Sequence, residues 1–363
     1  MSLPLNRGWM IYGATGYTGR LIVAEAVRRG LAPVLAGRDA ARLAQIARPL
    51  GLEARTVGLG DPPALARALD GIGVVLNAAG PFTATAAALA GACLAAGAHY
   101  LDVTGEIPVF AALHGRDAEA RARGVLLMPG AGFIVAPSDC LAAHVAARLP
   151  GARRLRLGIS GSRLVSRGSA RTLASLVSEG VQVRRDGSLI LLPWGGLERA
   201  FDFGRGPRPC LAVSWADVYT AGLTTDIPDV EVYLEVEAWE RALFLGSRIF
   251  APWYRTPLGQ ALMEAQVRML PEGPTAAERA RSHRVLVAEA EDGQGRRARS
   301  RLHAPEAYTF TAMTAVEAAV RVLRGEVQAA AGFQTPARVF GADFVLSFAG
   351  VVREDLEGPG PRS

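Results

Sequence analysis

The sequence predicts an α/β protein in two parts. A doubly wound parallel sheet is expected over residues 1–136, and a second α+β domain on a mostly antiparallel sheet over residues 137–350. Three observations predict this division. Strand and helix patterns alternate through the first third of the chain, a glycine-rich turn joins the first strand to the first helix, and period-2 patterns begin at about Pro137. The 363 residues are enough for two domains, each with its own core.

The first domain is expected to alternate strictly between strand and helix. Its expected strands are Trp9–Tyr12, Pro33–Ala36, Glu53–Val57, Val74–Asn77, His99–Asp102 and Val125–Met128. The expected helices between them are Thr18–Arg29, Ala40–Pro49, Pro62–Leu69, Ala84–Ala96 and Ile107–Arg123. Right-handed crossovers join such strands into a complete dinucleotide-binding sheet. Ligands bind at the carboxyl ends of its strands, where loops 61–63 and 77–81 are expected.

Residues 10–19, with the sequence MIYGATGYTG, are the most informative segment of the chain. Gly13 permits a tight turn after the first strand, Gly16 lets the backbone approach a pyrophosphate, and Gly19 allows the helix to pack closely on the strand. The helix that starts there directs its N-terminal N–H groups at the anion. Strand, turn and helix together predict a Rossmann-type dinucleotide site.

The end of the second expected strand indicates which dinucleotide binds. It runs into Gly37-Arg38-Asp39, so glycine stands where an acidic residue usually holds the ribose of NAD. Arg42 lies one helical turn further along. A guanidinium suits the 2′-phosphate of NADP, and the missing carboxylate removes a repulsion against it. The pattern favours NADP(H); the alternative is that Arg38 only caps a surface turn.

The second domain is expected to open with a helix at Ser138–Arg148. Its expected strands are Arg154–Ser160, Val181–Arg184, Leu189–Pro193, Val230–Trp239, Arg284–Glu291 and Arg299–Leu302. Hairpin turns are expected at Asp186-Gly187 and at residues 292–295. Helices at Ser169–Glu179 and Phe310–Arg324 should cover one face of this sheet, and residues 351–363 are expected to be a disordered tail.

Composition excludes several kinds of chemistry. The chain has no lysine, so its 40 basic residues are all arginine, and neither a Schiff base nor a catalytic lysine is available. This excludes the Tyr-x-x-x-Lys mechanism of short-chain dehydrogenases, which share an early glycine-rich turn. The net charge of +6 is spread along the chain without a basic stripe, so we expect no nucleic-acid partner.

Cysteine, histidine and apolar patterns bear on metals and location. The 3 cysteines and 5 histidines have no ligand spacing, so we expect no metal. No apolar run is long enough to span a bilayer and the first strand begins too early for a signal peptide, so we expect a cytoplasmic protein. The apolar segment Leu243–Leu270 is interpreted either as a buried or subunit-facing helix pair, or as a lid or peripheral lipid contact.

Several motifs along the chain together resemble one family. They are GATGYTG at 13–19, AGRD at 36–39, NAAGPF at 77–82, YLDVTGE at 100–106, PSD at 137–139, RGSART at 167–172, IPDVEVY at 227–233 and GFQTP at 332–336. The chain resembles the saccharopine dehydrogenase-like oxidoreductases with an NADP-binding domain, in the branch that includes trans-acting enoyl reductases. The resemblance covers nearly the whole chain.

The resemblance implies a cofactor site around the glycine turn. The residues implied to contact NADP(H) are Gly13, Thr15, Gly16, Tyr17, Thr18, Gly19, Arg38, Asn77, Ala79, Gly80 and Pro81. It also places Asp102, Thr104, Gly105 and Glu106 where the reactive ring meets the substrate. The alternative for the two acids is a helix-cap arrangement with Thr104.

Without lysine, another group must supply a proton. The candidate donors are Tyr219, Asp102, Glu106 and His99, or a water held by Asn77. Tyr219 lies in the motif WADVYTA at 215–221, for which the alternative is a strand-end turn with Trp215 in the core.

One departure from the family pattern bears on the substrate. Family members usually carry an acid where this chain has Ile134, so the resemblance implies a more apolar substrate or a lost role at that position. We therefore expect a homodimeric NADPH-dependent oxidoreductase that reduces a C=N or C=C bond of a small or apolar acyl-type substrate. The alternative is a non-catalytic NADP-binding sensor, or a partner subunit that acts in trans on another enzyme.

Overall fold

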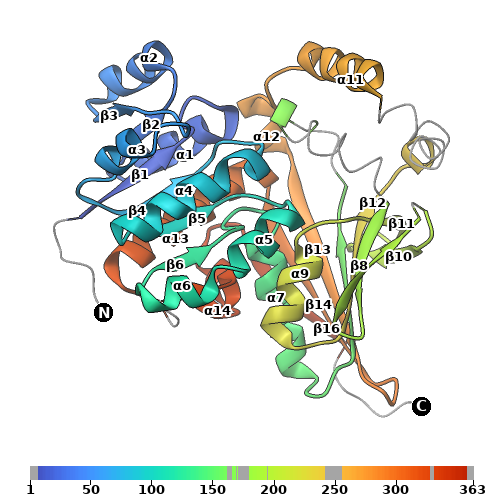
Figure 1. The fold of residues 1–363 in the computed structure, drawn as a ribbon. Helices are drawn as coiled ribbons and strands as arrows, with labels where there is room; N and C mark the ends of the chain where they lie inside the picture. Colours follow the sequence, from blue (N-terminus) through green and yellow to red (C-terminus); the bar gives the residue numbers. More distant parts are fainter. Residues whose placement is uncertain are drawn as a thin grey trace. The chain divides into compact units, whose positions relative to one another are not determined.

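The computed structural model describes residues 7–161, 166–168, 170, 180–193, 195–241, 256–327 and 331–357. The chain divides into two compact units (Figure 1). Met1–Ala136 and Ala307–Val345 form the first, and Pro137–Glu306 and Leu346–Ser363 form the second. The helix expected at Ser169–Glu179, residues 242–255 of the apolar segment and residues 358–363 lie wholly or almost wholly outside the described residues.

The first unit is built on a parallel sheet whose strand order is β15-β6-β5-β4-β1-β2-β3. The strands are β1 (Gly8–Tyr12), β2 (Val34–Gly37), β3 (Ala54–Thr56), β4 (Ile72–Asn77), β5 (His99–Asp102), β6 (Leu126–Met128) and β15 (Gly332–Phe333). The first helices are α1 (Tyr17–Arg28), α2 (Ala40–Leu50), α3 (Pro62–Ala68) and α4 (Phe82–Ala96). Every residue of β4 is buried, as expected of a central parallel strand covered on both faces. The predicted doubly wound fold is confirmed.

The helix expected over Ile107–Arg123 is two helices, α5 (Ile107–His114) and α6 (Asp117–Ala122). The break follows from a long-range contact. Asp117 Oδ1 accepts a 2.7 Å hydrogen bond from the N–H of Phe333 in β15, a strand that the sequence pattern did not predict. Arg121 also donates to Asp117, at 2.8 Å. Asp117 thus anchors a new helix start under the edge strand.

The helix expected at Phe310–Arg324 is α13 (Ala307–Arg324), and its place differs from the expectation. It belongs to the first unit, where it packs against α1 and the central strands β1 and β4, and so does not cover the second sheet. Thr311 Oγ1 accepts from the N–H of Phe133 at 3.0 Å, and Thr314 Oγ1 donates to the carbonyl of Ala131 at 2.8 Å. An apolar helical stripe predicts burial but does not specify which sheet receives it.

The second unit is built on a mixed sheet with the strand order β10-β11-β12-β7-β13-β14-β16 and a side hairpin of β8 and β9. The strands are β7 (Arg154–Ile159), β8 (Val181–Arg185), β9 (Ser188–Leu192), β10 (Glu198–Asp202), β11 (Pro207–Ala212), β12 (Asp229–Glu235), β13 (His283–Glu291), β14 (Arg297–Pro305) and β16 (Val352–Glu357). The helices of this unit are α7 (Ala136–Arg148), α9 (Asp217–Thr225), α11 (Pro257–Met269) and α12 (Ala276–Arg281). Among the described strands of this second sheet, only the pair β12–β7 is parallel.

Two expectations for this unit have clear outcomes. Asp186 and Gly187, with φ of +46° and +79°, form the two-residue turn of the β8–β9 hairpin, as predicted. The described part of the expected tail differs: residues 352–357 pair with β14 as β16. Glu354 of β16 lies 3.4 Å from Arg301 and 3.6 Å from His303 of β14, contacts that only the folded sheet reveals.

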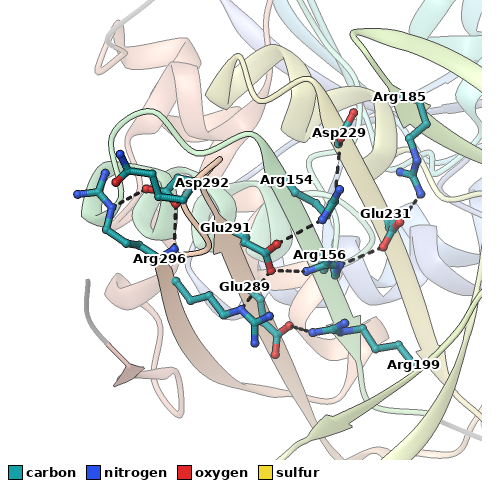
Figure 2. A network of polar contacts seen from close by, with 12 residues as sticks. Arg154, Arg156, Arg185, Arg199, Asp229, Glu231, Glu289, Glu291, Asp292 and Arg296 are labelled. Atoms are coloured by element: carbon teal, nitrogen blue, oxygen red, sulfur yellow. Dashed lines mark hydrogen bonds and ion pairs between the residues drawn. The ribbon is translucent and has the colours of Figure 1, made fainter. Parts of the chain in front are cut away.

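The second sheet has one apolar and one charged face. Leu155, Leu157 and Ile159 of β7 are buried, whereas Arg154 and Arg156 alternate with them on the opposite face. On that charged face, arginines and acids of neighbouring strands form a network of ion pairs (Figure 2). Arg156 lies between Glu231 of β12, at 3.3 Å, and Glu291 of β13, at 3.2 Å. Cross-strand pairs of opposite charge contribute to register as well as to stability.

Candidate cofactor and active site

The glycine turn follows β1 and its geometry assigns a different role to each glycine. A Cβ on Gly13, whose φ is +84°, would lie 2.7 Å from the backbone N of Ala79, and a Cβ on Gly19 would lie 2.2 Å from the carbonyl oxygen of Gly13. Both glycines are therefore required for the loops and α1 to close. A Cβ on Gly16 would meet only the Gly13 oxygen, at an ordinary 3.5 Å, and Gly16 is exposed. The fold tolerates a side chain there, so the glycine at this position suits close approach of a ligand.

The N-terminus of α1 has the properties of an anion site. Its N-cap is Gly16, no side chain caps it, and its first turn has no acidic residue. Thr15 and Thr18 are half-buried, and the ring of Tyr17 packs edge-on against Tyr308 at 5.2 Å between centroids. A helix N-terminus carries partial positive charge and N–H donors. The turn and helix therefore fit the pyrophosphate of a dinucleotide.

Arg38 follows β2 directly and fits the 2′-phosphate expected there. It is exposed and makes no ion pair with any residue that the structure describes. Asp39 has a separate role, since its side chain accepts a 3.0 Å hydrogen bond from the N–H of Arg42 and caps α2. Burial raises the pKa of the Tyr12 hydroxyl, and the Arg38 charge opposes that shift. Because Tyr12 ends β1, the guanidinium lies at the same carboxyl edge of the sheet as the turn.

Asn77 ends β4, is fully buried, and shapes the loop that faces the turn. Its Oδ1 accepts from the N–H of Ala79 at 2.9 Å, and its Nδ2 donates to Thr85 Oγ1 at 3.1 Å. Thr85 in turn donates to the carbonyl of Ala79 at 2.7 Å. Gly80 and Pro81 follow in the same loop, and Pro81 is the N-cap of α4. Asn77 therefore holds the backbone of the loop that lies against the glycine turn.

Asp102 ends β5 and its carboxylate is fully buried and hydrogen-bonded. Oδ1 accepts from the N–H groups of Thr104 and Gly130, each at 3.0 Å, and Oδ2 accepts from the hydroxyl of Tyr100 at 2.8 Å. Tyr100 also accepts from Asn77 Nδ2 at 3.1 Å, so Asn77, Tyr100 and Asp102 form a chain. Desolvation raises the pKa of Asp102 to about 6, although the backbone hydrogen bonds oppose it.

Glu106 has the geometry of a helix cap. Its Oε1 accepts from the N–H of Phe82 at 3.2 Å and its Oε2 from the N–H of Thr83 at 2.9 Å, so the carboxylate lies at the N-terminus of α4. The N–H of Glu106 donates to Thr104 Oγ1 at 3.0 Å. Thr104 thus links Asp102 and Glu106 as the alternative interpretation expects. A catalytic role for either acid stays a prediction.

Ile134 lies directly against this loop. A Cβ on Gly105 would lie 2.7 Å from Ile134 Cγ2, so the glycine makes room for the isoleucine. Ile134 is half-buried, which leaves part of an apolar side chain accessible beside Gly105. The surroundings of this loop therefore include an apolar wall.

Tyr219 lies on α9 in the second unit, whereas Asp102 and Glu106 belong to the first unit. It is half-buried, and burial raises its pKa while the Arg184 charge opposes that shift. At the start of the same helix, Ser138 Oγ donates to Asp217 Oδ1. Asp217 Oδ2 and Thr220 Oγ1 are buried and find no partner among the described residues. Burial raises the pKa of Asp217 to about 7.

Sequence reasoning did not single out Tyr100 or Asp217. Tyr100 is two residues before Asp102 on one strand, so period 2 puts both side chains on one face, and this signal was available. Asp217 and Ser138 are 79 positions apart, and no local pattern joins them. His99, named as a candidate donor, accepts at Nδ1 from the N–H of Leu126 at 3.0 Å, and burial lowers its pKa to about 4.

The described residues contain neither a candidate metal centre nor a candidate membrane-spanning helix. No group of three or more histidine, cysteine, aspartate or glutamate side chains is arranged to hold a metal ion in the part of the chain that the structure describes. Among the same residues, no helix combines the length and the apolar character needed to cross a bilayer.

Several known proteins are similar to this chain in sequence or in fold. Residues 9–128 match the family model described as the saccharopine dehydrogenase NADP binding domain. A Mycobacterium tuberculosis protein assigned to the trans-acting enoyl reductases is 28% identical over 312 residues, covering 73% of each chain. A saccharopine dehydrogenase-like oxidoreductase of Arabidopsis thaliana is 32% identical over 151 residues, 36% of this chain and 32% of the relative. The apo saccharopine dehydrogenase (L-Glu forming) of Saccharomyces cerevisiae shares the fold, with a TM-score of 0.63 at 12% identity over 97% of this chain and 100% of that one.

Proposed function

We propose that this chain, whose N-terminal domain belongs to the saccharopine dehydrogenase NADP-binding family, is an NADPH-dependent oxidoreductase that reduces a C=N or C=C bond. We propose a small or apolar acyl-type substrate. The proposal of NADPH as cofactor rests on the glycine turn together with Arg38, which has no acidic partner among the described residues. The observation that favours an apolar substrate is Ile134 against Gly105, in the loop that carries Glu106.

The chemistry divides between the cofactor and the chain. Bound NADPH supplies a hydride to one atom of the double bond. The other atom needs a proton, and we propose the Tyr219 hydroxyl as its source, because the chain has no lysine and this hydroxyl is half-buried. The raised pKa of Tyr219 keeps the hydroxyl protonated near neutral pH.

The acids of the first unit have supporting roles in this proposal. Asp102 holds Tyr100, and Tyr100 holds the amide of Asn77, which fixes the backbone of loop 77–81. Glu106 caps α4 and joins the same loop from the other side. Asp102 and Glu106 would therefore act by positioning the loop that borders the cofactor path.

A second candidate is favoured by the same hydrogen bonds. Both oxygens of Asp102 and both oxygens of Glu106 are engaged in structural contacts, as in a protein that binds NADP(H) without turnover. Such a protein would be a sensor or a partner subunit of another enzyme. A homodimeric state and a cytoplasmic location accompany either proposal, and light scattering and cell fractionation test them.

The test has two stages. NADPH fluorescence measures binding, and absence of binding at micromolar protein and cofactor overturns both candidates. NADPH oxidation is then followed with a panel of imines and a panel of enoyl thioesters. Turnover with one panel supports the reductase and identifies the bond, whereas tight binding without turnover on either panel supports the non-catalytic candidate.

A variant pair tests the proton donor. Tyr219→Phe should lower kcat at least about tenfold while the Kd for NADPH is unchanged, since general acid catalysis contributes roughly that much or more. Tyr233→Phe is the matched control, because its hydroxyl also lies in the second unit but donates to Glu231 at 2.7 Å. Equal turnover in Tyr219→Phe and wild type would remove Tyr219 from the mechanism.

A further inference from the structure

The second unit contains a hollow of about 850 Å³ that the proposed redox site does not use. It lies where the carboxyl end of β7, the loop between β10 and β11, the end of α12 and strands β13, β14 and β16 meet. All of its lining residues are described and all belong to the second unit. Small-molecule pockets usually occupy roughly 300–1,000 Å³, so the hollow is large enough for an organic molecule and not only for a bare ion.

The lining of the hollow is dominated by basic side chains. The lining has six basic and two acidic side chains. The basic ones are Arg205, Arg281, Arg284, Arg301, His283 and His303, and the acidic ones are Glu278 and Glu354. Phe203 and Val285 add apolar wall. Convergent guanidinium groups suit the oxygens of phosphates and carboxylates, because their N–H donors match such acceptors in geometry and charge.

The acidic residues of the lining are already engaged. Glu278 closes a capping box with Thr275, whose N–H donates to Glu278 Oε2 at 2.7 Å. Glu354 lies 3.4 Å from Arg301 and 3.6 Å from His303. Neither carboxylate pairs with Arg281 or His283 among the residues that the structure describes, and the lining keeps more basic than acidic side chains.

Some basic side chains and ring or guanidinium nitrogen atoms of the lining have no hydrogen-bond partner among the described residues. The side chains of Arg281 and His283 are exposed and make no hydrogen bond or ion pair with the residues that the structure describes. Arg301 Nε and His303 Nε2 are buried and have no hydrogen-bond partner among those residues. Buried donors without partners cost stability, so groups of this kind in a lined hollow indicate a missing acceptor.

The position of Arg301 is fixed by its surroundings. Its Nη2 donates to the carbonyl of Asp202 at 3.2 Å, and Asp202 Oδ1 holds the adjacent turn by accepting from the N–H of Gly204 at 2.7 Å. A Cβ on Gly204, whose φ is +95°, would lie 3.1 Å from Arg301 Nη1. The loop and the guanidinium are thus built around each other, which reduces the ordering cost of binding a ligand.

We propose that this hollow is a binding site for a small organic anion that carries a phosphate or carboxylate group. Arg281, His283, Arg301 and His303 supply the donors, and Phe203 forms the apolar wall. The site shares no residue with the proposed redox site: the glycine turn and Arg38 lie in the first unit, and Tyr219, in the second unit, does not line the hollow.

Titration calorimetry of the full chain tests the proposal, with inorganic pyrophosphate as the phosphate probe and citrate as the carboxylate probe. Both titrations are run at ionic strength matched with sodium chloride. The double variant Arg281→Ala/His283→Ala should weaken binding of the preferred probe at least about tenfold, since hydrogen bonds to charged groups contribute that much or more. Arg301→Gln is a second variant that reaches the interior of the hollow.

The matched control is Arg297→Ala, at the opposite end of β14, which removes the same charge outside the hollow. It should change the Kd by less than about twofold, because Arg297 does not line the hollow and salt screens exposed charges at a distance. Tighter binding of pyrophosphate assigns a phosphate ligand, and tighter binding of citrate assigns a carboxylate. Absence of binding at millimolar concentration of both probes, equal binding by the double variant, or equal losses in the control variant would overturn the proposal.

Discussion

The hydroxyl of Tyr100 donates a 2.8 Å hydrogen bond to Asp102 Oδ2 in the buried interior of the first sheet. Since Asn77 Nδ2 also donates to Tyr100, the hydroxyl proton can only be accepted by the carboxylate. The remaining oxygen of Asp102 fixes two backbone N–H groups of the loops after β5 and β6. This one carboxylate therefore ties three strand ends together at the edge where the cofactor is expected.

Asp102→Asn should lower the free energy of unfolding by about 1–3 kcal/mol. An amide has one accepting oxygen, so either the Tyr100 hydroxyl or the backbone N–H groups lose their acceptor. Chemical denaturation at pH 7 measures the change. Asp70→Asn, an exposed substitution of the same kind in the same unit, should stay within about 0.5 kcal/mol of wild type. Equal stability of Asp102→Asn and wild type would contradict the assigned hydrogen bonds.

Asp217→Asn should change how stability depends on pH. Burial is the main cause that raises the pKa of Asp217 from its ordinary 3.8 to about 7. The protonated carboxyl therefore contributes stability that is fully present below pH 3.8 and is lost as the pH rises through about 7. The asparagine variant does not titrate there. Its stability relative to wild type should therefore rise between pH 4 and pH 7 and level off above.

Denaturation curves at several pH values across that window check this prediction. Asp226→Asn is the matched control, because Asp226 is exposed at the end of the same helix with φ of +56°, a conformation that asparagine also adopts. A stability difference between Asp217→Asn and wild type that does not vary with pH would show that Asp217 titrates outside the window.

Gly16→Ala and Gly19→Ala should separate cofactor binding from folding. The Cβ at position 16 has room in the protein, so stability should fall by less than about 1 kcal/mol, while NADPH affinity falls at least about tenfold. The Cβ at position 19 would lie 2.2 Å from a backbone oxygen, so that variant should lose at least about 2 kcal/mol of stability. Unfolding curves and NADPH fluorescence measure both effects. Unchanged NADPH affinity in Gly16→Ala would show that the cofactor does not approach this glycine.

Arg38→Ala should weaken NADPH binding about tenfold to a hundredfold and leave NADH binding nearly unchanged. The reason is that in the proposed site the guanidinium would contact only the 2′-phosphate, and a charge-assisted hydrogen bond contributes roughly 1.5–3 kcal/mol. The ratio of the two dissociation constants is the measurement. Arg48→Ala, an exposed arginine at the end of α2, should leave the ratio at its wild-type value. Loss of affinity for both cofactors alike would assign Arg38 to another contact.

Arg156→Ala should destabilise the second unit by about 1–3 kcal/mol. Its side chain is 12% exposed and lies between Glu231 and Glu291, so removing it leaves a nearly buried carboxylate with fewer partners. Arg268, whose side chain is 71% exposed and pairs with Glu264, provides the control, and Arg268→Ala should cost less than about 0.5 kcal/mol. Thermal unfolding of both variants compares them; equal effects would mean that the network is held mainly by solvent-exposed contacts.

The elements that local patterns predicted well depend on interactions between residues that are close together in the sequence. The β1–turn–α1 segment spans a few consecutive residues, and the Asp186-Gly187 hairpin depends on two positive φ values that these residue types adopt readily. The division of one expected helix into α5 and α6 was not predictable in this way. It depends on a hydrogen bond between Asp117 and Phe333, 216 positions apart.

The candidate site shows the same difference between features set by nearby residues and features set by distant ones. The positions of Gly13, Gly16, Gly19 and Arg38 follow from motif spacing alone, and the structure adds which glycines the fold itself requires. From the sequence alone, Asp102 and Glu106 could have either a catalytic or a helix-capping role. Their hydrogen bonds run to residues 24 and 28 positions away, which a linear pattern does not bring together.

The sequence by itself determined the doubly wound first domain and the class of cofactor. The first follows from strands and helices that alternate along one continuous segment, and the second from strand–turn–helix chemistry within about forty consecutive residues. Only the tertiary structure decided that α13 returns to the first unit, that residues 352–357 complete the second sheet, and that the basic side chains of β13, β14 and α12 line one hollow. The physical reason is that apolar periodicity encodes which face of an element is buried, whereas the partner of that face is chosen by packing and hydrogen bonds between distant residues.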